Sequence, residues 1–315
     1  MTALLSLHAI GGAAQTGDIH GTWTAEIHTG KVFLQTRTAP PPDWNRSRGD
    51  WDGDWSMGQT MAVEEVSGLT NDERLTAGAI KFELRREAGT LLFEGSFREG
   101  RGAGLFTFAP RAEFANEMAR LGYRDELALW RRYQMAVQDV GPRYINALKS
   151  EGFQNLGLDQ ITRARNHGVT VEYIKSMKAE GYKAATLEEL VRTRDHGVTA
   201  AYVQEMRKAG FTTESIDELV RAKDHGVNAA YVSELSRHGY GNLPLSDVVR
   251  ARDHGVTADY VEDMKAIAKE ATLPQMIRMR DHGVTPGFVS HARARGFTTS
   301  DPDELVRLKD RGLRP

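Results

Sequence analysis

One histidine recurs at a nearly constant spacing along the second half of the sequence. Successive copies lie 28 or 29 residues apart, each within an Asp-His-Gly-Val-Thr element or a close variant: His167, His196, His225, His254 and His282. Imidazole is a common metal ligand, so a metal site is one interpretation. However, stacked helices lie about 8–10 Å apart, whereas zinc needs each nitrogen at about 2.0–2.1 Å. We therefore expect no metal or cofactor, and a structural role in which the histidine complements the helix dipole and bonds free carbonyls.

Two cationic residues precede each histidine in the same elements. The first of each pair is an arginine: Arg163, Arg192, Arg221, Arg250 and Arg278. Such a stripe is a candidate interaction surface for an acidic partner or a phosphate. Residues 111–315 contain 31 cations and 29 acids, among them the aspartate beside most of the histidines, so ion pairs between repeats are the more ordinary interpretation. This balance makes nucleic-acid binding the weaker alternative to a protein or peptide partner.

An aromatic residue follows each of these elements at a fixed offset. The set is Tyr173, Tyr202, Tyr231, Tyr260 and Phe288. Each lies on the apolar stripe of a predicted helix, which favours packing in a core over stacking on a ligand.

A segment rich in proline, tryptophan, glycine and aspartate extends over residues 39–58, and we expect a long loop. Trp51 and Trp55 are candidate platforms for a sugar ring or a peptide, or they fold over a sheet as a lid. Three aspartates within residues 50–54 alternate as in a calcium loop, but the glycine and glutamate that an EF-hand requires are missing. The alternative function is therefore binding of a small ligand or glycan here, and a looser calcium site stays open.

The elements that position the repeated residues are predicted to be helical hairpins in residues 110–315. Thr186 with Glu189 predicts a helix start, and Gly197 with Val198 predicts a helix end. The equivalent glycines are Gly168, Gly197, Gly226, Gly255 and Gly283. Helices of about ten residues are unstable alone in water, so neighbouring units must stack into an α-solenoid.

Residues 18–109 alternate between apolar and polar positions, as around Trp23, Phe82 and Phe106. This period of two predicts an antiparallel sheet with one buried face. The predicted fold class is α+β, with an N-terminal antiparallel β domain followed by an α-solenoid of repeats about 29 residues long. Residues 1–17 are expected to be a flexible start or a degenerate signal segment.

The composition excludes several classes of protein. Among 315 residues there are 41 Lys and Arg, 43 Asp and Glu, and no cysteine, which excludes disulfides and thiolate chemistry. No apolar run is long enough for a transmembrane helix, so membrane insertion is not expected. The compartment stays open between periplasm and cytoplasm, because a lack of cysteine fits both.

The sequence contains no zincin, nucleophile-elbow, Walker or dinucleotide-binding motif. Leu92–Phe97 and Gly102–Phe108, followed by repeated Gly-Val-Thr-x-x-Tyr-Val units, resemble the C-terminal region of bacterial membrane-anchored metallopeptidase sensors of the beta-lactam-sensor type. The resemblance implies a sensory or interaction role outside the cytoplasmic membrane. It carries over no catalysis, since this sequence lacks the peptidase domain, membrane helices and zinc motif. We predict a non-enzymatic module that presents a helical-repeat surface to a protein or peptide.

Overall fold

The computed structural model describes residues 18–39, 55–124, 127–184, 186–211, 215–241 and 243–312. Contacts divide the chain into two compact units, with the boundary between Asn166 and His167. The last strand ends at Pro110, and every described element after it is a helix. This confirms the predicted α+β class, in which an antiparallel sheet comes first and helical repeats follow.

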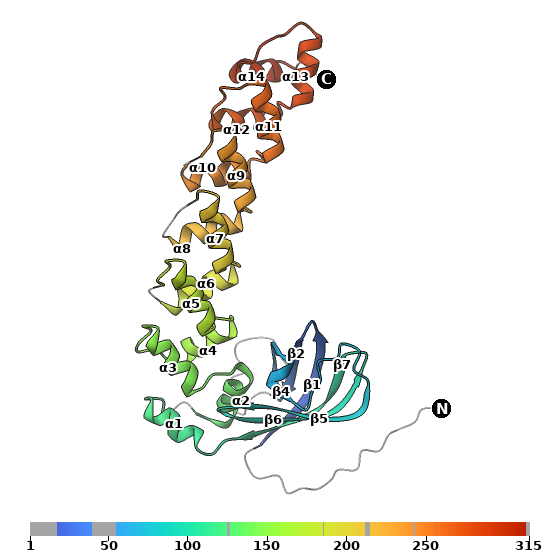
Figure 1. Cartoon of the computed structure of the whole chain (residues 1–315), viewed down its shortest axis with the longest axis vertical. Helices are drawn as coiled ribbons and strands as arrows, with labels where there is room; N and C mark the ends of the chain where they lie inside the picture. The colour runs from blue at the N-terminus through green and yellow to red at the C-terminus, as the bar shows by residue number, and fades with distance from the viewer. Residues whose placement is uncertain are drawn as a thin grey trace, which may run out of the picture. The chain divides into compact units, whose positions relative to one another are not determined.

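Seven strands form one antiparallel sheet in the order β3-β2-β1-β7-β6-β5-β4 (Figure 1). The pairing of β1 with β7 joins a meander of three strands to a meander of four. A short 3-10 helix, Val63–Glu65, connects β3 to β4. The strands are β1 Ile19–His28, β2 Lys31–Thr38, β3 Trp55–Ala62, β4 Val66–Ser67, β5 Ala77–Arg86, β6 Gly89–Arg98 and β7 Arg101–Pro110.

The buried face of the sheet holds the apolar residues that alternate in the sequence. Trp23 is the centre of an aromatic cluster, with its ring centroid 4.9 Å from Phe82 and 6.0 Å from Phe93. Its indole Nε1 donates a hydrogen bond to the Glu94 carbonyl at 3.1 Å. A Cβ on Gly95 would lie 2.8 Å from the indole ring, so this glycine makes room for Trp23.

The structure places an edge strand where the sequence predicted only a loop. The loop was expected to extend to Gly58, but β3 begins at Trp55 and pairs with β2 along its length. Gly58 weakens the strand signal, and a Cβ there would lie 3.0 Å from the exposed Phe33 ring. Residues 40–54, with Trp51 and the three aspartates, lie outside the described residues.

Helix α2, Leu129–Gln138, packs against the sheet within the region that was predicted as helical repeats. The Tyr133 ring stacks on Phe106, with centroids 5.6 Å apart. Its hydroxyl donates a hydrogen bond to Thr36 Oγ1 at 2.7 Å, and burial raises the pKa of Tyr133 to about 12. This helix therefore completes the core of the sheet.

The later helices alternate between two types. We call the helix before each His-Gly-Val element an A helix and the helix after it a B helix. The A helices are α4 Leu158–Asn166, α6 Leu187–Asp195, α8 Ile216–Asp224, α10 Leu245–Asp253, α12 Leu273–Asp281 and α14 Pro302–Asp310. The B helices are α5 Val171–Ala179, α7 Ala200–Lys208, α9 Ala229–Arg237, α11 Ala258–Ile267 and α13 Pro286–Ala294, while α1 Phe114–Arg120 and α3 Pro142–Ser150 come earlier.

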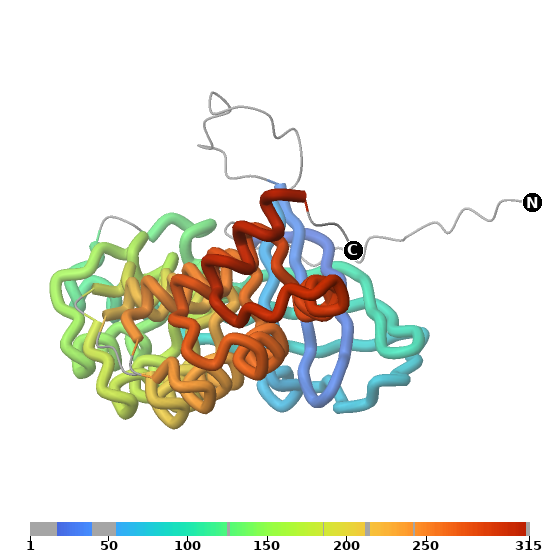
Figure 2. Tube along the Cα trace, turned by 90° about the horizontal axis from the view of Figure 1, so that it is seen from above, coloured from blue at the N-terminus to red at the C-terminus, as the bar shows by residue number. Residues whose placement is uncertain are grey.

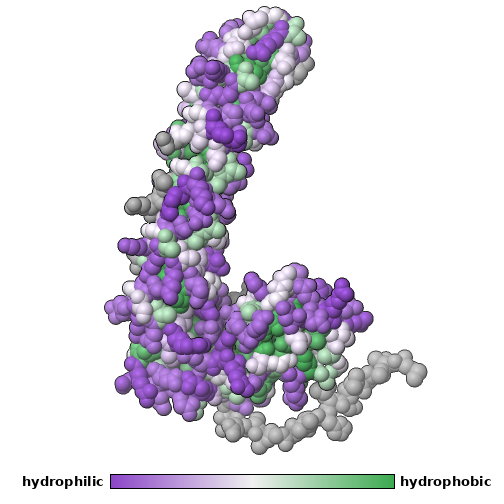
Figure 3. All heavy atoms as spheres, in the orientation of Figure 1, coloured by the Kyte–Doolittle hydropathy of each residue, from purple (hydrophilic) through white to green (hydrophobic). Residues whose placement is uncertain are grey.

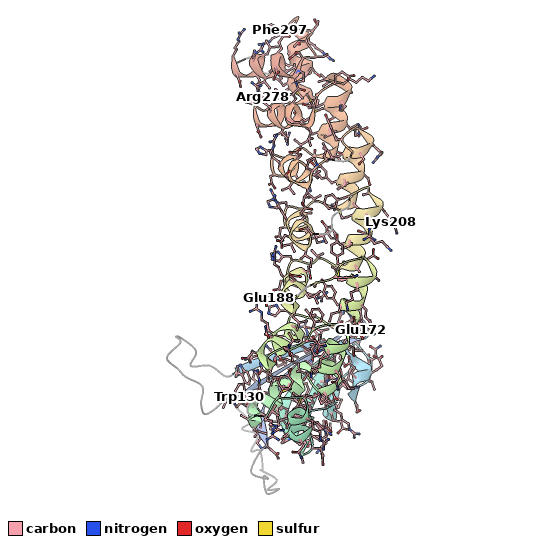
Figure 4. The ribbon with its side chains drawn as sticks, turned by 90° about the vertical axis from the view of Figure 1, so that its left-hand side faces the viewer. Trp130, Glu172, Glu188, Lys208, Arg278 and Phe297 are labelled. Atoms are coloured by element: carbon pink, nitrogen blue, oxygen red, sulfur yellow. The ribbon has the colours of Figure 1, made fainter. Side chains whose placement is uncertain are left out.

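In the unit that begins at His167, like helices stack on like. The A helices contact one another in series, and so do the B helices. Figures 1 and 2 show these successive hairpins following one another along the unit. In Figure 4, Glu188 and Arg278 lie on the A layer, and Glu172 and Lys208 lie on the B layer. The apolar side chains between the two layers form the core, as a solenoid requires.

Candidate interaction surface of the helical repeats

Caps of the predicted kind turn the chain from each A helix into the next B helix. In the second copy, Val198 N–H donates to the Thr193 carbonyl at 2.8 Å, and Thr199 Oγ1 accepts from Tyr202 N–H at 3.2 Å. The glycine that precedes this valine has a left-handed backbone. Its φ is 74° at Gly168, 67° at Gly197, 68° at Gly226, 71° at Gly255 and 69° at Gly283. This turn leaves the histidine at the C-terminal end of the A helix, facing the next repeat.

An exposed ladder of histidine and aspartate side chains joins successive A helices. Each imidazole Nδ1 is hydrogen bonded to an aspartate Oδ1 of the next repeat: His167–Asp195 at 2.6 Å, and His196–Asp224, His225–Asp253, His254–Asp281 and His282–Asp310 at 2.7 Å. The side chains are between 32% and 51% exposed, so water screens each pair. The partner is thus a carboxylate and not the free carbonyls expected from sequence, because stacking brings the next aspartate alongside.

The histidine and aspartate side chains of the ladder do not converge on one position where a metal ion could bind. Neighbouring imidazoles belong to different repeats, and each already bonds an aspartate. Within the described residues, no group of three His, Cys, Asp or Glu side chains is arranged to hold a metal ion.

A buried tyrosine hydroxyl makes a second contact between repeats. Tyr202 donates a hydrogen bond to the Val227 carbonyl at 2.9 Å, and Tyr231 donates to the Val256 carbonyl at 2.8 Å. Burial raises the pKa of both phenols to about 12, because the charged form loses its water. The aromatic residues predicted to lie in the core are all buried: Tyr173, Tyr202, Tyr231, Tyr260 and Phe288.

The second cation of each Arg-x-Arg pair lies over the aromatic ring of the preceding repeat. The charged groups lie 4.6–5.3 Å from the ring centroids: Arg165 over Tyr144, Arg194 over Tyr173, Lys223 over Tyr202, Arg252 over Tyr231, Arg280 over Tyr260 and Lys309 over Phe288. These cations serve contacts within the array. The first cation of each pair is therefore the candidate to contact a partner at the surface.

The first cation of each pair is exposed on the outer face of the A layer. Arg192 forms an ion pair with Asp217 at 2.7 Å, and Arg278 forms one with Asp303 at 2.8 Å. Arg163 also has a partner. The five arginines occupy equivalent positions in the sequence. In the structure they differ in whether an acidic residue of the next A helix forms an ion pair with them.

Arg221 and Arg250 are the two members that differ. Neither guanidinium has an ion-pair or hydrogen-bond partner within the part of the chain that the structure describes. The pairing acid stands at the second position of the next A helix, and that position holds Ser246 in α10 and Pro274 in α12. Aligning the starts of the A helices in the sequence would have revealed this difference.

A hollow of about 510 Å³ lies beside Arg221, between α8, α9 and α10. Its apolar lining includes Phe211, Val232, Leu235, Leu243, Leu245 and Val248. Ser236, Ser246 and Tyr240 also line the hollow, as does the acidic residue Glu218. In Figure 3 hydrophilic side chains cover most of the visible surface of the repeats, and hydrophobic side chains show between them.

Trp55 lies on the edge strand β3 and packs against helix α2. It is half-buried, and its ring lies 6.0 Å from the Trp130 ring and 6.2 Å from the Tyr133 ring of α2. The geometry matches the interpretation in which the tryptophan packs over the sheet. Trp51 lies outside the described residues, so a glycan or small-ligand site in that loop stays a prediction.

Comparisons with protein-family models, with curated proteins and with solved structures found no match for this chain. The resemblance to metallopeptidase sensors therefore stays a prediction. Among the described residues, no helix combines the length and the apolar character needed to cross a membrane.

Proposed function

We propose that this chain is a non-enzymatic interaction module whose A layer binds a protein or peptide. The observation that carries the proposal is the regular linkage between repeats. Each interface from α6 to α12 uses the same exposed His–Asp bond, and the buried Tyr–carbonyl bond recurs between the same repeats. Such a frame holds the outer faces of the A helices in a fixed series, which suits recognition of an extended partner.

Two features of the A layer support a protein partner over a nucleic acid. Among its arginines, Arg192 is paired with Asp217 and Arg278 with Asp303, both carboxylates of the next repeat. The aromatic rings that recur in the repeats are buried: Tyr173, Tyr202, Tyr231, Tyr260 and Phe288. These rings therefore offer no stacking platform for bases. A sensory role, as the resemblance implies, would use the same surface.

The test presents the full chain to a random peptide library, a glycan array and single-stranded oligonucleotides. We expect enrichment of related peptides, whose binding changes with Glu188→Lys on the A layer but not with Glu172→Lys on the B layer. These two exposed glutamates give a matched pair of charge reversals (Figure 4). Exclusive binding of glycans, or of oligonucleotides with a steep salt dependence, would contradict the proposal.

A further inference from the structure

We propose that the middle of the A layer is a docking site for an acidic protein segment with one apolar side chain. The site consists of Arg221, Arg250 and the hollow between α8, α9 and α10. This inference rests on the proposed function, because it names the kind of partner that the A layer would take.

The ion pair between the first arginine of one A helix and the second residue of the next A helix is interrupted in the middle of the array. At the second position of the A helices from α4 to α14 stand Asp159, Glu188, Asp217, Ser246, Pro274 and Asp303. Asp217 and Asp303 at this position form ion pairs with the first arginine of the preceding A helix. The two non-acidic residues follow one another, so the two arginines that have no partner among the described residues are also neighbours, on helices that stack about 8–10 Å apart.

Among the described residues, the nearby acids form no ion pair with Arg221 or Arg250. Asp224 and Asp253 are bound to His196 and His225 of the ladder. Glu218 has a partner of its own, and Asp247 makes no ion pair with Arg250 although it is one turn away on α10. An exposed guanidinium presents a planar fork of donors that matches a carboxylate, so two adjacent forks favour an acidic partner.

A hollow lined by both apolar and polar side chains lies at the same place. Arg221 lines its rim, and Ser246, which also lines it, is one helical turn before Arg250. The volume of about 510 Å³ lies in the range of ligand pockets and has room for a leucine or phenylalanine side chain. An apolar anchor flanked by carboxylates would therefore contact the hollow and both arginines together.

The test uses the full chain and a short fluorescent peptide in which a leucine lies between glutamates, with fluorescence anisotropy as the readout. Ser246→Asp supplies the acid that other A helices carry and gives Arg221 an internal partner. We expect this variant to fold at least as well as the wild type, since an acid in the first turn favours a helix. Its affinity for the peptide should fall by up to about fivefold, the upper end of the range for one exposed ion pair.

Ser290→Asp is the matched control, because it makes the same change at an exposed position on the B helix α13. It should leave the affinity unchanged, while Ser246→Asp combined with Pro274→Asp should lower it about tenfold or more. Replacing the leucine of the peptide by serine should weaken binding to the wild type, which tests the hollow separately from the arginines.

Four outcomes would overturn this inference, and they differ in what they say about the function. Equal affinity in Ser246→Asp and Ser290→Asp, no loss with the serine peptide, or a preference for the peptide with lysines in place of glutamates would remove this site and leave the interaction module standing. Failure to bind any peptide, acidic, basic or neutral, would overturn the proposed function as well.

Discussion

Each interface between repeats from α6 to α12 has one exposed and one buried polar contact, and the two contacts are expected to contribute differently to stability. The His196–Asp224 pair is about 40% exposed on both sides, and pairs of this kind contribute about 0–1 kcal/mol. The Tyr202 hydroxyl is buried against the Val227 carbonyl, where an unsatisfied group costs about 1–3 kcal/mol. The histidine is the more visible signal in the sequence, but the tyrosine is expected to contribute more to stability.

We therefore expect Tyr202→Phe to lower the free energy of unfolding by about 1 kcal/mol, because the Val227 carbonyl loses its donor. Urea denaturation measures this change. An unchanged midpoint would mean that water reaches the carbonyl and replaces the hydroxyl.

The same residue predicts an alkaline loss of stability. Burial raises the pKa of Tyr202 from 10.0 to about 12, so the unfolded chain loses this proton first. The stabilisation is complete below pH 10 and decreases as the pH rises toward 12. Unfolding followed over this interval should show a shallower decline for Tyr202→Phe than for the wild type, and equal slopes would contradict the assignment.

For the ladder, a double-mutant cycle of His196→Ala and Asp224→Ala should give a coupling energy of about 0.3–1 kcal/mol. The two side chains are in contact across a repeat interface, so the cycle isolates their interaction. Measurements with and without added salt should show weaker coupling at high salt, because the pair is exposed. A coupling of zero would leave the histidine with no role in joining repeats.

At the scale of the element, short helices depend on their caps and on their neighbours. Most A and B helices are nine residues long, too short to be stable alone in water. Helix α6 begins with Thr186 as a side-chain cap and ends before Gly197, which has a φ of 67°. The local sequence thus determines where each helix starts and stops, while stacking supplies the stability.

Gly197→Val should destabilise the repeats by about 1–2 kcal/mol or more, since a β-branched residue resists a positive φ. A Cβ there meets only Lys223 Cε, at an ordinary 3.6 Å, so the cost comes from the backbone rather than from a clash. Gly287→Ala in α13 is the matched control, because Gly287 is exposed and not among the positive-φ residues. That change should be neutral or stabilising, and a neutral Gly197→Val would refute the cap.

At the scale of the whole molecule, the chain consists of two compact units that divide between Asn166 and His167. In a stacked array each repeat contacts its neighbours, so stability is approximately a sum of local terms. Sequence-distant strands such as β1 and β7 instead form one cooperative sheet.

Amide hydrogen exchange of Gly197→Val should therefore show a local loss of protection. Exchange should accelerate in α5 to α8, the helices that adjoin the altered turn, before it changes in β5 to β7. A uniform loss of protection over the whole chain would show that the array and the sheet unfold as one cooperative body.

Much of the architecture was predictable because its signals are local. Alternation around Trp23 and Phe82 predicted buried positions of strands, and Gly197 with Val198 predicted a turn, since both depend on residues close in the chain. The edge strand from Trp55 was missed, because Gly58 and a proline-rich approach resemble a loop.

Only the tertiary structure decided which partners the repeated polar residues have. His196 and Asp224 are 28 residues apart, and Arg192 and Asp217 belong to different A helices, so their pairing depends on how repeats stack. The sequence by itself determined five equivalent arginines along a helical array. Stacking then paired some of them with carboxylates and left Arg221, which lines the hollow, and the neighbouring Arg250 exposed, because a side chain's partner is set by proximity in space.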